Sequence, residues 1–589
     1  MIALVWATQA GRRTAERLAA ALPDATVHTG PVRDQLERAW GTADQIVAFL
    51  ATGATVRLIA PLLHDKTTDP GVVCVDEAGR YAVALLGGHA GGANVLARKV
   101  ATVLGAEPVV TTATDATAVS PLDTYGADLG FRIADRAPLA TVTKAMLDGE
   151  PIHVVSDAVW PLPALPPNAA PHDPVSRRAT SGDPAPSERD AAGGAPHRIV
   201  ISHHVKAPPG ALVYRPPSLV VGVGASRGVP AAEIAELIDT ALSDAGLAVA
   251  SVRCLATADV KADEPGIREV AGARGWSVVT HAADALASVP VPNPSEVVRA
   301  AVGTPSVAEA AALLTARQVG RDAELVVAKR ASAMATVAVA RLTPRGRLSI
   351  VGLGPGAEDL LTPRAVAALQ RASIVVGLTS YVDQIRHLLR PGIRIEASGL
   401  GEEETRARTA VELATAGHAV ALIGSGDAGV YAMASPALEY AGEDVDVVGV
   451  PGVTAALAAS SLLGAPLGHD HAYLSLSDLH TPWPVIDRRV QAVAEADLVA
   501  CLYNPRSAKR DWQLGKVLGV FAAHRPPGTP VGLVRDATRP DETVTLTTLG
   551  ELAADPSVVD MLTVVLVGAS GTRTIAGRMV TPRGYRWMA

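Results

Sequence analysis

A glycine-rich loop with the spacing of a ligand-binding turn lies near the middle of the 589-residue chain. The run 348–351 (LSIV) has the length of a buried strand, and glycines occupy alternate positions across 352–356. Glycine lets a chain turn tightly and lets bare backbone approach a ligand. Thr362 and Pro363 have the residue types of a helix N-cap and a first helical position. We therefore expect a small-molecule cleft at the carboxyl edge of an α/β sheet.

The segment 352–357 also satisfies the dinucleotide-binding pattern G-x-G-x-x-G/A. That pattern requires the glycines to open directly onto a helix and requires an acidic residue at the end of the next strand. Here residues 357–361 intervene before Thr362, and the next apolar run, 373–376, is followed by Gly377 rather than by an acid. We therefore favour a different small molecule over a nicotinamide dinucleotide.

Candidate proton-transfer residues lie further along the chain. Asp478 and His480 are two positions apart, so in an extended segment their side chains share one face. Such a pair supplies both an acid and a base, and nearby Trp483 could seal a cleft. The His-Asp-His sequence at 469–471 raises the question of a metal, but no further ligand stands at readable spacing, so we expect these residues to cap a strand. No metal ligands are predicted.

A second glycine loop occupies residues 87–92 (GGHAGG) near the N-terminus, between an apolar run and a helical pattern. A helix start of this kind favours an anion such as a substrate carboxylate. His89 has a suitable unperturbed pKa for a general base near neutrality, and Arg57 and Lys66 could hold carboxylates. The simpler interpretation is that the glycines form turns, His89 bonds the backbone, and Asp65 and Lys66 form a solvated pair.

The elements that must position these residues suggest four regions. Strand-like and helix-like segments alternate over residues 1–155, which indicates an α/β domain. A proline-rich stretch follows within 156–215 and has little capacity to bury a core. Residues 216–340 read as a second α/β unit, whose first helix carries an apolar face. The last region is 347–589, and the expected fold class is α/β and multidomain throughout.

Composition narrows the class of protein. The net charge is −7, from 52 basic and 59 acidic residues, which argues against a nucleic-acid partner. The three cysteines are far apart and lack metal spacing, so we expect a reducing cytoplasm. The first residues read as a strand rather than a signal peptide. The most apolar long window, 445–467, contains an aspartate, a proline and several glycines, so no membrane association is expected.

Several of these motifs resemble the tetrapyrrole methylase family. The stretch 348–363 resembles its opening loop, 424–431 (GSGDAGVY) its second glycine loop and 451–456 (PGVTAA) its third. The motifs at 475–483 and 502–507 resemble the branch that methylates C-17 of precorrin-3B and contracts the macrocycle on the route to cobalamin. The resemblance covers about residue 347 to the last residue.

This resemblance implies two α/β halves with S-adenosylmethionine, the methyl donor, in the cleft between them. It implies that the cofactor contacts these residues: Gly354, Pro355, Gly426, Asp427, Val430, Tyr431, Thr454, Ala455, Tyr503, Ala537 and Thr538. Asp478 is the safer proton-transfer residue, because the branch commonly has leucine at the position of His480. The family usually has proline where Ala428 stands; that loss loosens the loop but removes no ligand group, so we expect cofactor binding to survive.

A tetrapyrrole carries many carboxylates and therefore needs cations, for which guanidinium groups suit best. Arg506 and Arg535 are the predicted substrate-binding residues in this region. Other basic residues lie nearby in the sequence: Arg488, Arg489, Lys509 and Arg510. Arg488 and Arg489 could instead form a solvated helix face.

The first 340 residues resemble the cobalt-precorrin-5A hydrolase family. The motifs that carry the resemblance are the glycine loop at 87–92, the segment 216–224 (PPSLVVGVG) and the segment 257–261 (TADVK). The family opens a ring-A lactone on the macrocycle and releases acetaldehyde. It often has a cysteine and an arginine where Ala225 and Ser226 stand, so a non-enzymatic tetrapyrrole binder stays an alternative.

The chain is thus interpreted as a fusion of two cobalamin-pathway modules. The resemblance implies a homodimer, a substrate with or without cobalt, and other corrin-pathway enzymes as partners. Methylation of RNA or protein, which other members of the superfamily perform, is the alternative activity. The net acidity, the motif at 502–507 and the fused pathway module all oppose it.

Overall fold

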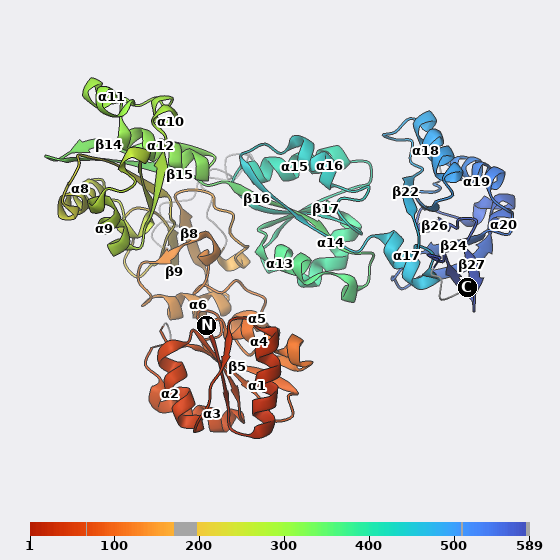
Figure 1. Cartoon of the computed structure of the whole chain (residues 1–589), viewed down its shortest axis with the longest axis horizontal. Helices are drawn as coiled ribbons and strands as arrows, with labels where there is room; N and C mark the ends of the chain where they lie inside the picture. The colour runs from red at the N-terminus through yellow and green to blue at the C-terminus, as the bar shows by residue number, and fades with distance from the viewer. Residues whose placement is uncertain (66–67, 170–196, 508–509, 585–589) are drawn as a thin grey trace, which may run out of the picture. The chain divides into compact units, whose positions relative to one another are not determined.

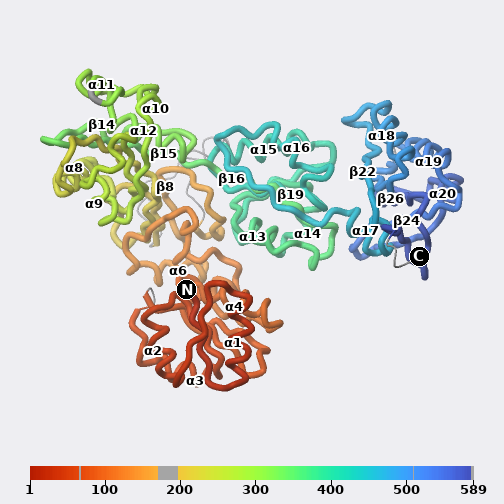
Figure 2. The backbone as a smooth tube through the Cα atoms, in the orientation of Figure 1, coloured from red at the N-terminus to blue at the C-terminus, as the bar shows by residue number. Residues whose placement is uncertain are grey.

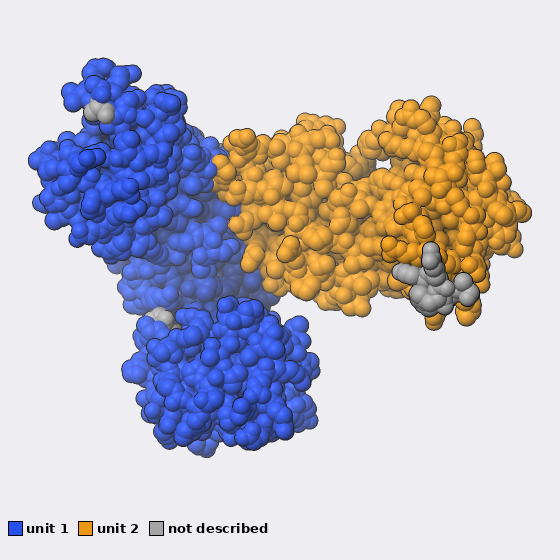
Figure 3. Space-filling view, in the orientation of Figure 1, with its two compact units in different colours: residues 1–344, 390–392 blue, residues 345–389, 393–589 orange. Residues whose placement is uncertain are grey.

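The computed structural model describes residues 1–65, 68–169, 197–507 and 510–584. The chain divides into two compact units, residues 1–344 with 390–392 and residues 345–389 with 393–589, coloured separately in Figure 3. Within the described part of the chain, no helix has the length and apolar character needed to cross a membrane. Each unit is built of α/β layers, as the sequence predicts.

The N-terminal part of the first unit is a six-stranded sheet in the order β2-β1-β3-β4-β5-β6. Within it, β4 and β5 pair antiparallel as a hairpin around Gly79, whose φ is +67°. The elements are β1 (Ile2–Trp6), α1 (Gln9–Ala21), β2 (Ala25–Val27), α2 (Val32–Thr42), β3 (Gln45–Phe49), α3 (Thr52–Ile59), β4 (Gly71–Val75), β5 (Tyr81–Leu86), α4 (Ala93–Leu104), β6 (Glu107–Val109) and α5 (Ala113–Ala116).

A second, four-stranded sheet follows in the order β7-β10-β9-β8. Its elements are β7 (Arg132–Ile133), α6 (Leu139–Leu147), β8 (Ile152–Ser156), β9 (His197–Ile201) and β10 (Leu212–Arg215). The predicted boundary at residue 155 falls inside β8. The prediction that 156–215 has little capacity to bury a core is wrong for residues 160–169, because Leu162, Leu165 and Ala169 lie in one buried cluster with Tyr214. The apolar residues between the prolines supply this core.

A third sheet completes the first unit, with five strands in the order β13-β12-β11-β15-β14. The predicted apolar helix face is confirmed: Ile234, Ile238 and Leu242 are fully buried in the core of this domain. The elements are β11 (Leu219–Ala225), α8 (Ala231–Asp244), β12 (Val252–Ala258), α9 (Pro265–Arg274), β13 (Ser277–His281), α10 (Ala283–Ala287), α11 (Glu296–Val302), α12 (Val307–Val319), β14 (Asp322–Ala331) and β15 (Ala335–Thr343).

The second unit opens with a parallel five-stranded sheet in the order β18-β17-β19-β16-β20, with helices on both faces (Figure 1). The elements are β16 (Gly346–Gly352), α13 (Pro363–Arg371), β17 (Ile374–Leu378), α14 (Thr379–Ile385), β18 (Arg394–Ser398), α15 (Glu403–Thr415), β19 (Ala419–Gly424), α16 (Ala434–Tyr440) and β20 (Val445–Val450). The chain leaves β16 toward one edge and leaves β19 toward the other, so a topological switch point lies between their carboxyl ends.

The other half of the second unit is a mixed five-stranded sheet in the order β22-β23-β26-β24-β25, beside a small three-stranded sheet β21-β28-β27. Helix α17 connects the two halves and can be followed along the tube in Figure 2. The elements are α17 (Ala455–Leu463), β21 (Gly464–Ala465), β22 (His471–Ser475), α18 (Trp483–Glu495), β23 (Val499–Tyr503), α19 (Gln513–His524), β24 (Pro530–Arg535), β25 (Thr543–Thr548), α20 (Leu549–Ala554), β26 (Thr563–Val567), β27 (Arg573–Ile575) and β28 (Arg578–Val580).

Candidate functional site

The carboxyl ends of β16, β19 and β20 bring three glycine loops into backbone contact. The Gly354 N–H donates to the Gly426 carbonyl at 3.0 Å, and the Gly426 N–H donates to the Gly354 carbonyl at 2.7 Å. Both glycines have positive φ, +74° and +65°. A Cβ on Gly452 would lie 2.2 Å from the Gly426 carbonyl oxygen. Glycine at these positions is therefore what allows the loops to pack this closely at the switch point.

Asp427 fixes the second loop to the third. Its Oδ1 accepts a hydrogen bond from the Gly429 N–H at 2.8 Å, and its Oδ2 accepts one from the Gly452 N–H at 3.0 Å. A carboxylate that accepts from backbone amides makes stronger hydrogen bonds than a neutral acceptor. The predicted cofactor residue Asp427 thus also sets the geometry of the loops.

The C-terminal half contributes a tyrosine to the same loops. The Tyr503 hydroxyl lies 2.6 Å from Thr454 Oγ1 and accepts a hydrogen bond from the Ala456 N–H at 2.9 Å. Burial raises the pKa of Tyr503, so the hydroxyl stays protonated at neutral pH. The Tyr431 ring packs against that of Tyr503 at 5.4 Å between centroids, and the Tyr431 hydroxyl donates to the Tyr473 carbonyl at 2.7 Å. An aromatic wall thus spans the two halves.

Tyr431 combines backbone strain with exposure. Its φ is +53°, a left-handed conformation that is uncommon for a bulky residue. Its side chain remains 53% exposed, although it belongs to the aromatic wall. Strained residues of this kind gather at ligand sites, because the surrounding structure holds them in place.

The loop after β24 closes onto the first two glycine loops. Thr538 Oγ1 accepts a hydrogen bond from the Ala357 N–H at 3.1 Å. Arg539 donates from Nε to the Pro355 carbonyl at 3.0 Å and from Nη2 to Ser425 Oγ at 3.3 Å. Sequence analysis missed Arg539, because nothing in its local sequence shows that it reaches loops more than a hundred residues away.

The predicted cofactor residues therefore lie at the ends of three adjacent strands and on two loops of the opposite half. On the first half these are Gly354, Pro355, Gly426, Asp427, Val430, Tyr431, Thr454 and Ala455, and on the second half Tyr503, Ala537 and Thr538.

The two predicted proton-transfer residues have different surroundings. Asp478 is half-buried, and its Oδ2 accepts a hydrogen bond from Gln513 Nε2 at 3.0 Å. His480 is exposed, and the chain bends at residues 479–480 instead of staying extended, so the expected alternation of side chains does not extend to it. Trp483 packs edge-on against Trp512, with ring centroids 4.7 Å apart.

The predicted carboxylate-binding arginines both have protein partners. Arg506 donates from Nη1 to the carbonyls of Ser557 at 3.1 Å and Val559 at 3.5 Å. Arg535 pairs with Asp560 at 2.8 Å and with Asp536 at 2.7 Å. Two carboxylates already neutralise Arg535, so a substrate carboxylate would have to displace or share them.

In the N-terminal domain, His89 belongs to a polar cluster. Its Nε2 lies 2.7 Å from Thr114 Oγ1 and 3.3 Å from Asp115 Oδ2. Asp115 also accepts hydrogen bonds from Thr112 and from Asn94 Nδ2, which is 2.9 Å away. Burial alone would raise the pKa of Asp115, but these hydrogen bonds and the neighbouring positive charges lower it. The carboxylate is therefore ionised at neutral pH beside the imidazole.

The expected anion site at the start of α4 is largely taken up by the loop itself. The Ala93 N–H donates to the Gly87 carbonyl at 3.1 Å, and the Asn94 N–H donates to the Gly88 carbonyl at 2.9 Å. These amides point back at the loop because Gly87 and Gly92, both with positive φ, fold it over the helix start.

The remaining predicted residues lie apart from these clusters. Arg57 is exposed and donates to the Gly53 carbonyl at 2.8 Å. Lys66 and Lys509 lie outside the described residues. His471 Nδ1 lies 3.1 Å from the His469 carbonyl oxygen. In the described part of the chain, the one group of three or more potential metal-ligating side chains is Asp157, His203 and His204, which sequence analysis missed.

Models of known protein families match both the methylase-like and the hydrolase-like regions of the chain. The model of tetrapyrrole (corrin/porphyrin) methylases matches residues 347–553. Models of the N-terminal, central and C-terminal regions of cobalamin synthesis protein G match residues 34–115, 120–216 and 219–340. The predicted fusion of a hydrolase-like region with a methylase region is confirmed.

Individual relatives match the methylase region. The chain is 47% identical over 241 residues to a probable cobalt-factor III C(17)-methyltransferase of Salmonella typhimurium, covering 40% of this chain and 99% of that protein. It is 40% identical over 251 residues to a precorrin-3B C(17)-methyltransferase of a Sinorhizobium species, covering 41% of this chain and 97% of that protein. It is also 41% identical to a cobalt-factor III methyltransferase of Priestia megaterium. That match covers 41% of this chain and 46% of the length of that protein.

Two solved structures were also compared. The crystal structure of the methyltransferase CobJ is 38% identical and is covered entirely, over 40% of this chain, with a TM-score of 0.39. A cobalamin biosynthesis protein G homolog from Sulfolobus solfataricus is 21% identical, with 96% of it and 58% of this chain covered and a TM-score of 0.25. On the sequence relatives and the family model together, the chain belongs to the tetrapyrrole (corrin/porphyrin) methylase family.

Proposed function

We propose that residues 347–589 methylate C-17 of precorrin-3B, or of its cobalt-containing counterpart, and contract the macrocycle in cobalamin biosynthesis. The observation that carries the proposal is the junction of three glycine loops at one switch point, joined to the opposite half through Tyr503 and Thr538. Two relatives named as C(17)-methyltransferases, which this chain covers almost entirely, support this acceptor.

The residues at this junction fit S-adenosylmethionine. Gly426, Gly429 and Ala455 have little or no side chain, so a ligand can approach the backbone closely there. The exposed Tyr431 ring offers an apolar face beside them. When bound, the sulfonium supplies an electrophilic methyl group, whose bond to the acceptor carbon forms as its bond to sulfur breaks, and the displaced thioether leaves.

The chain itself supplies positioning and proton transfer. Holding the acceptor carbon in line with the methyl group is worth up to about 7–11 kcal/mol, provided that the loops are rigid. The hydrogen bonds of Asp427 and Tyr503 provide that rigidity. Asp478, oriented by Gln513, is our proposed proton acceptor, with His480 as a second candidate. Arg506 and Arg535 are the proposed contacts for substrate carboxylates.

A methyl-transfer assay with several acceptors tests this activity. The full-length chain is incubated with labelled S-adenosylmethionine and, in parallel, with precorrin-3B, the cobalt form, bulk RNA and an unrelated protein mixture. The proposal predicts label in one macrocycle and none in RNA or protein. Label in RNA or protein alone would support the alternative activity and contradict the proposed one.

For residues 1–340 we propose hydrolysis of the lactone of cobalt-precorrin-5A. The favourable observation is the contact of His89 with Thr114 and the ionised Asp115, which suits a general base. His89 would take a proton from water, whose oxygen bonds to the lactone carbonyl carbon. The ring oxygen leaves with a proton as a hydroxyl group. In a second step that hydroxyl would lose its proton, the carbon–carbon bond to the macrocycle would break with its electron pair staying on the macrocycle carbon, that carbon would take up a proton, and the two-carbon fragment would depart as acetaldehyde. Arg57 and Lys66 are proposed carboxylate contacts.

Acetaldehyde release by the full-length chain tests this second activity. We expect His89→Gln to abolish release and to leave methyl transfer unchanged. Binding of the lactone substrate without any release by the wild-type chain would instead support the non-enzymatic tetrapyrrole binder.

The oligomeric state, the location and the partners of the enzyme are also proposed. We infer a homodimer in the cytoplasm and contacts with other corrin-pathway enzymes. Light scattering of the purified chain would show twice the 60.3 kDa mass if the dimer forms.

A further inference from the structure

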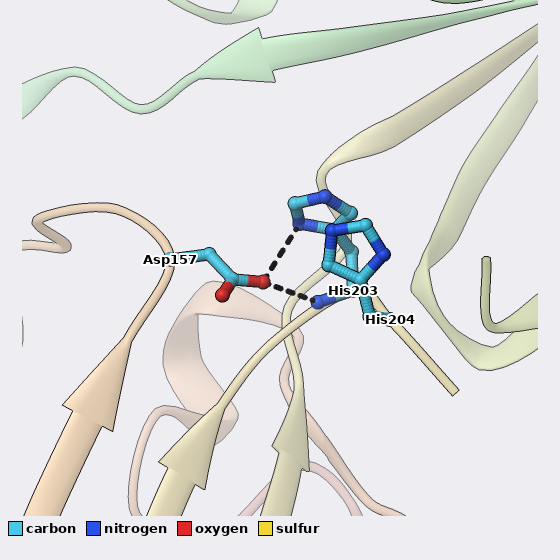
Figure 4. Close-up of side chains that lie close together, drawn as sticks. All are labelled: Asp157, His203 and His204. Atoms are coloured by element: carbon cyan, nitrogen blue, oxygen red, sulfur yellow. Dashed lines mark hydrogen bonds and ion pairs between the residues drawn. The ribbon is translucent and has the colours of Figure 1, made fainter. Parts of the chain in front are cut away.

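A cluster of three potential metal ligands lies in the first unit, away from His89. Asp157 follows β8, and His203 and His204 follow β9, the parallel strand beside it (Figure 4). One ligand atom from each side chain lies within 4.8 Å of those of the other two. Bonds of about 2.0–2.2 Å around a tetrahedral ion place its ligand atoms about 3.3–3.6 Å apart. The three side chains would therefore have to move closer together to bind an ion.

Hydrogen bonds hold the backbone of this cluster in place. Asp157 Oδ2 accepts from Ser202 Oγ at 2.5 Å and from the His203 N–H at 3.2 Å. Arg215, which is buried, donates to the carbonyl oxygens of Ser202 and Val205, each at 3.0 Å, and to that of His204. The two histidines thus sit on a segment that is fixed at both edges.

The side chains nevertheless keep unused ligand atoms. His203 is 3% exposed, and its Nε2 is buried without a hydrogen-bond partner among the described residues. An unsatisfied buried polar atom is unfavourable and so requires an explanation. The side-chain contacts of Asp157 with the described residues use Oδ2, which leaves Oδ1 open. If these side chains only linked the two strand ends, the 3.3 Å contact between His203 Nδ1 and Asp157 Oδ2 would be sufficient. That role would leave the two open atoms unexplained.

Basic side chains lie near the cluster. Arg321 and Arg341 line the cavity that Asp157 and His203 also line. Arg341 is paired with Glu324, and Arg215 donates to backbone carbonyls, which reduces their opposition to a bound cation.

Space is available beside the cluster. Asp157 and His203 line a cavity of about 240 Å³, and Asp157 and His204 line a second one of about 570 Å³. A metal held by three protein ligands keeps a coordination position for water or another ligand, as in catalytic zinc sites. Either cavity could hold such a ligand.

We propose that Asp157, His203 and His204 bind a divalent transition metal ion of the class that prefers nitrogen and oxygen ligands, with Zn²⁺ as the representative ion. The site requires two imidazoles and one carboxylate, a donor set that suits Zn²⁺, Co²⁺ and related ions better than Mg²⁺ or Ca²⁺. Nothing in the methyl-transfer proposal depends on this ion.

Zinc titration of the chelator-treated, full-length chain tests the proposal. We expect His204→Gln and Asp157→Asn each to weaken Zn²⁺ binding by at least about 100-fold. His204 is exposed, so its variant should keep the wild-type melting temperature, measured without metal. Titration with Co²⁺ should give visible ligand-field absorption in the wild type that His204→Gln loses.

The matched control is the double variant His469→Gln with His471→Gln. It removes two exposed histidines on either side of Asp470. It should bind Zn²⁺ as the wild type does. The proposal is overturned if His204→Gln and the wild type bind Zn²⁺ with the same affinity and stoichiometry, or if the control alone loses binding.

Discussion

The glycine loop after β5 and the glycine loops after β16, β19 and β20 each follow a strand of a sheet, yet their backbone amides have different partners. After β5, the amides at the start of α4 donate to carbonyls of the same loop. In the second unit, Gly354 and Gly426 bond across two loops, and Asp427 joins the second loop to a third. The first arrangement completes a turn, whereas the second builds one surface from three strand ends.

This difference shows that glycine spacing alone does not determine a binding site. In the second unit, the sheet order places β16 between β19 and β20, so three loops must meet, and glycine is needed because backbone touches backbone. In the first unit, a Cβ on Gly71 would lie 2.2 Å from the Gly91 carbonyl, so that loop packs on its own sheet. There, the chemistry falls to the side chains of His89 and Asp115.

The largest expected effect comes from breaking the junction of the three loops. Gly452→Ala would place a methyl group against the Gly426 carbonyl, a backbone atom that cannot move aside cheaply. We expect a loss of about 3 kcal/mol or more in cofactor binding, about 100-fold in affinity. Calorimetric titration with S-adenosylhomocysteine measures it.

Gly449→Ala is the matched control, because Gly449 lies on β20, the strand that leads to Gly452, and a Cβ there meets nothing within 4 Å. Equal cofactor affinity of the two variants would show that the junction is not where the cofactor binds.

Asp427→Asn tests the carboxylate that joins two of these loops. Asparagine has an NH2 group in place of one carboxylate oxygen, and that group cannot accept a hydrogen bond. The N–H group of either Gly429 or Gly452 therefore loses its acceptor. We expect a cost of about 1–3 kcal/mol in cofactor affinity. Asp446→Asn, an exposed carboxylate 4.0 Å from Arg345, should change affinity by less than about 1 kcal/mol. Similar losses in both variants would contradict the role of Asp427.

The first unit should be the more sensitive to acid, through His203. Its folded pKa of about 4 lies below the ordinary 6.5, so the unfolded state takes up a proton first as pH falls. The stability present above pH 6.5 should therefore decrease by about 2 kcal/mol at pH 5. Hydrogen exchange of residues 197–201, without added metal, measures this change. His203→Gln should remove this dependence, and an unchanged slope in that variant would contradict the assignment.

A smaller effect is expected from the hydroxyl that joins the halves of the second unit. Tyr503→Phe removes the contacts with Thr454 and the Ala456 N–H, for a cost of about 1–2 kcal/mol in cofactor affinity. Tyr473→Phe is the control, because its ring also packs on Tyr503 while its hydroxyl bonds none of the described residues. An equal loss in the control would assign the effect to ring packing rather than to the hydroxyl.

Local sequence predicts the parts of this structure that depend on local chemistry. The glycines of 352–356, the N-cap at Thr362 and the hairpin around Gly79 each follow from the backbone needs of a few neighbouring residues. Arg539 and the Asp157–His203 contact could not be predicted this way, because each pairs residues from distant strand ends. The core at residues 160–169 was missed because its prolines obscured the apolar residues between them.

The most direct test of the central claim is the structure of the product formed by the full-length chain. The reaction contains S-adenosylmethionine with a ¹³C-labelled methyl group and, in separate mixtures, precorrin-3B and its cobalt counterpart. We predict that one of them gains a single labelled methyl at C-17, seen by mass spectrometry and by the carbon spectrum. Transfer to a different ring carbon, or no transfer to either macrocycle while the cofactor remains bound, would contradict the account.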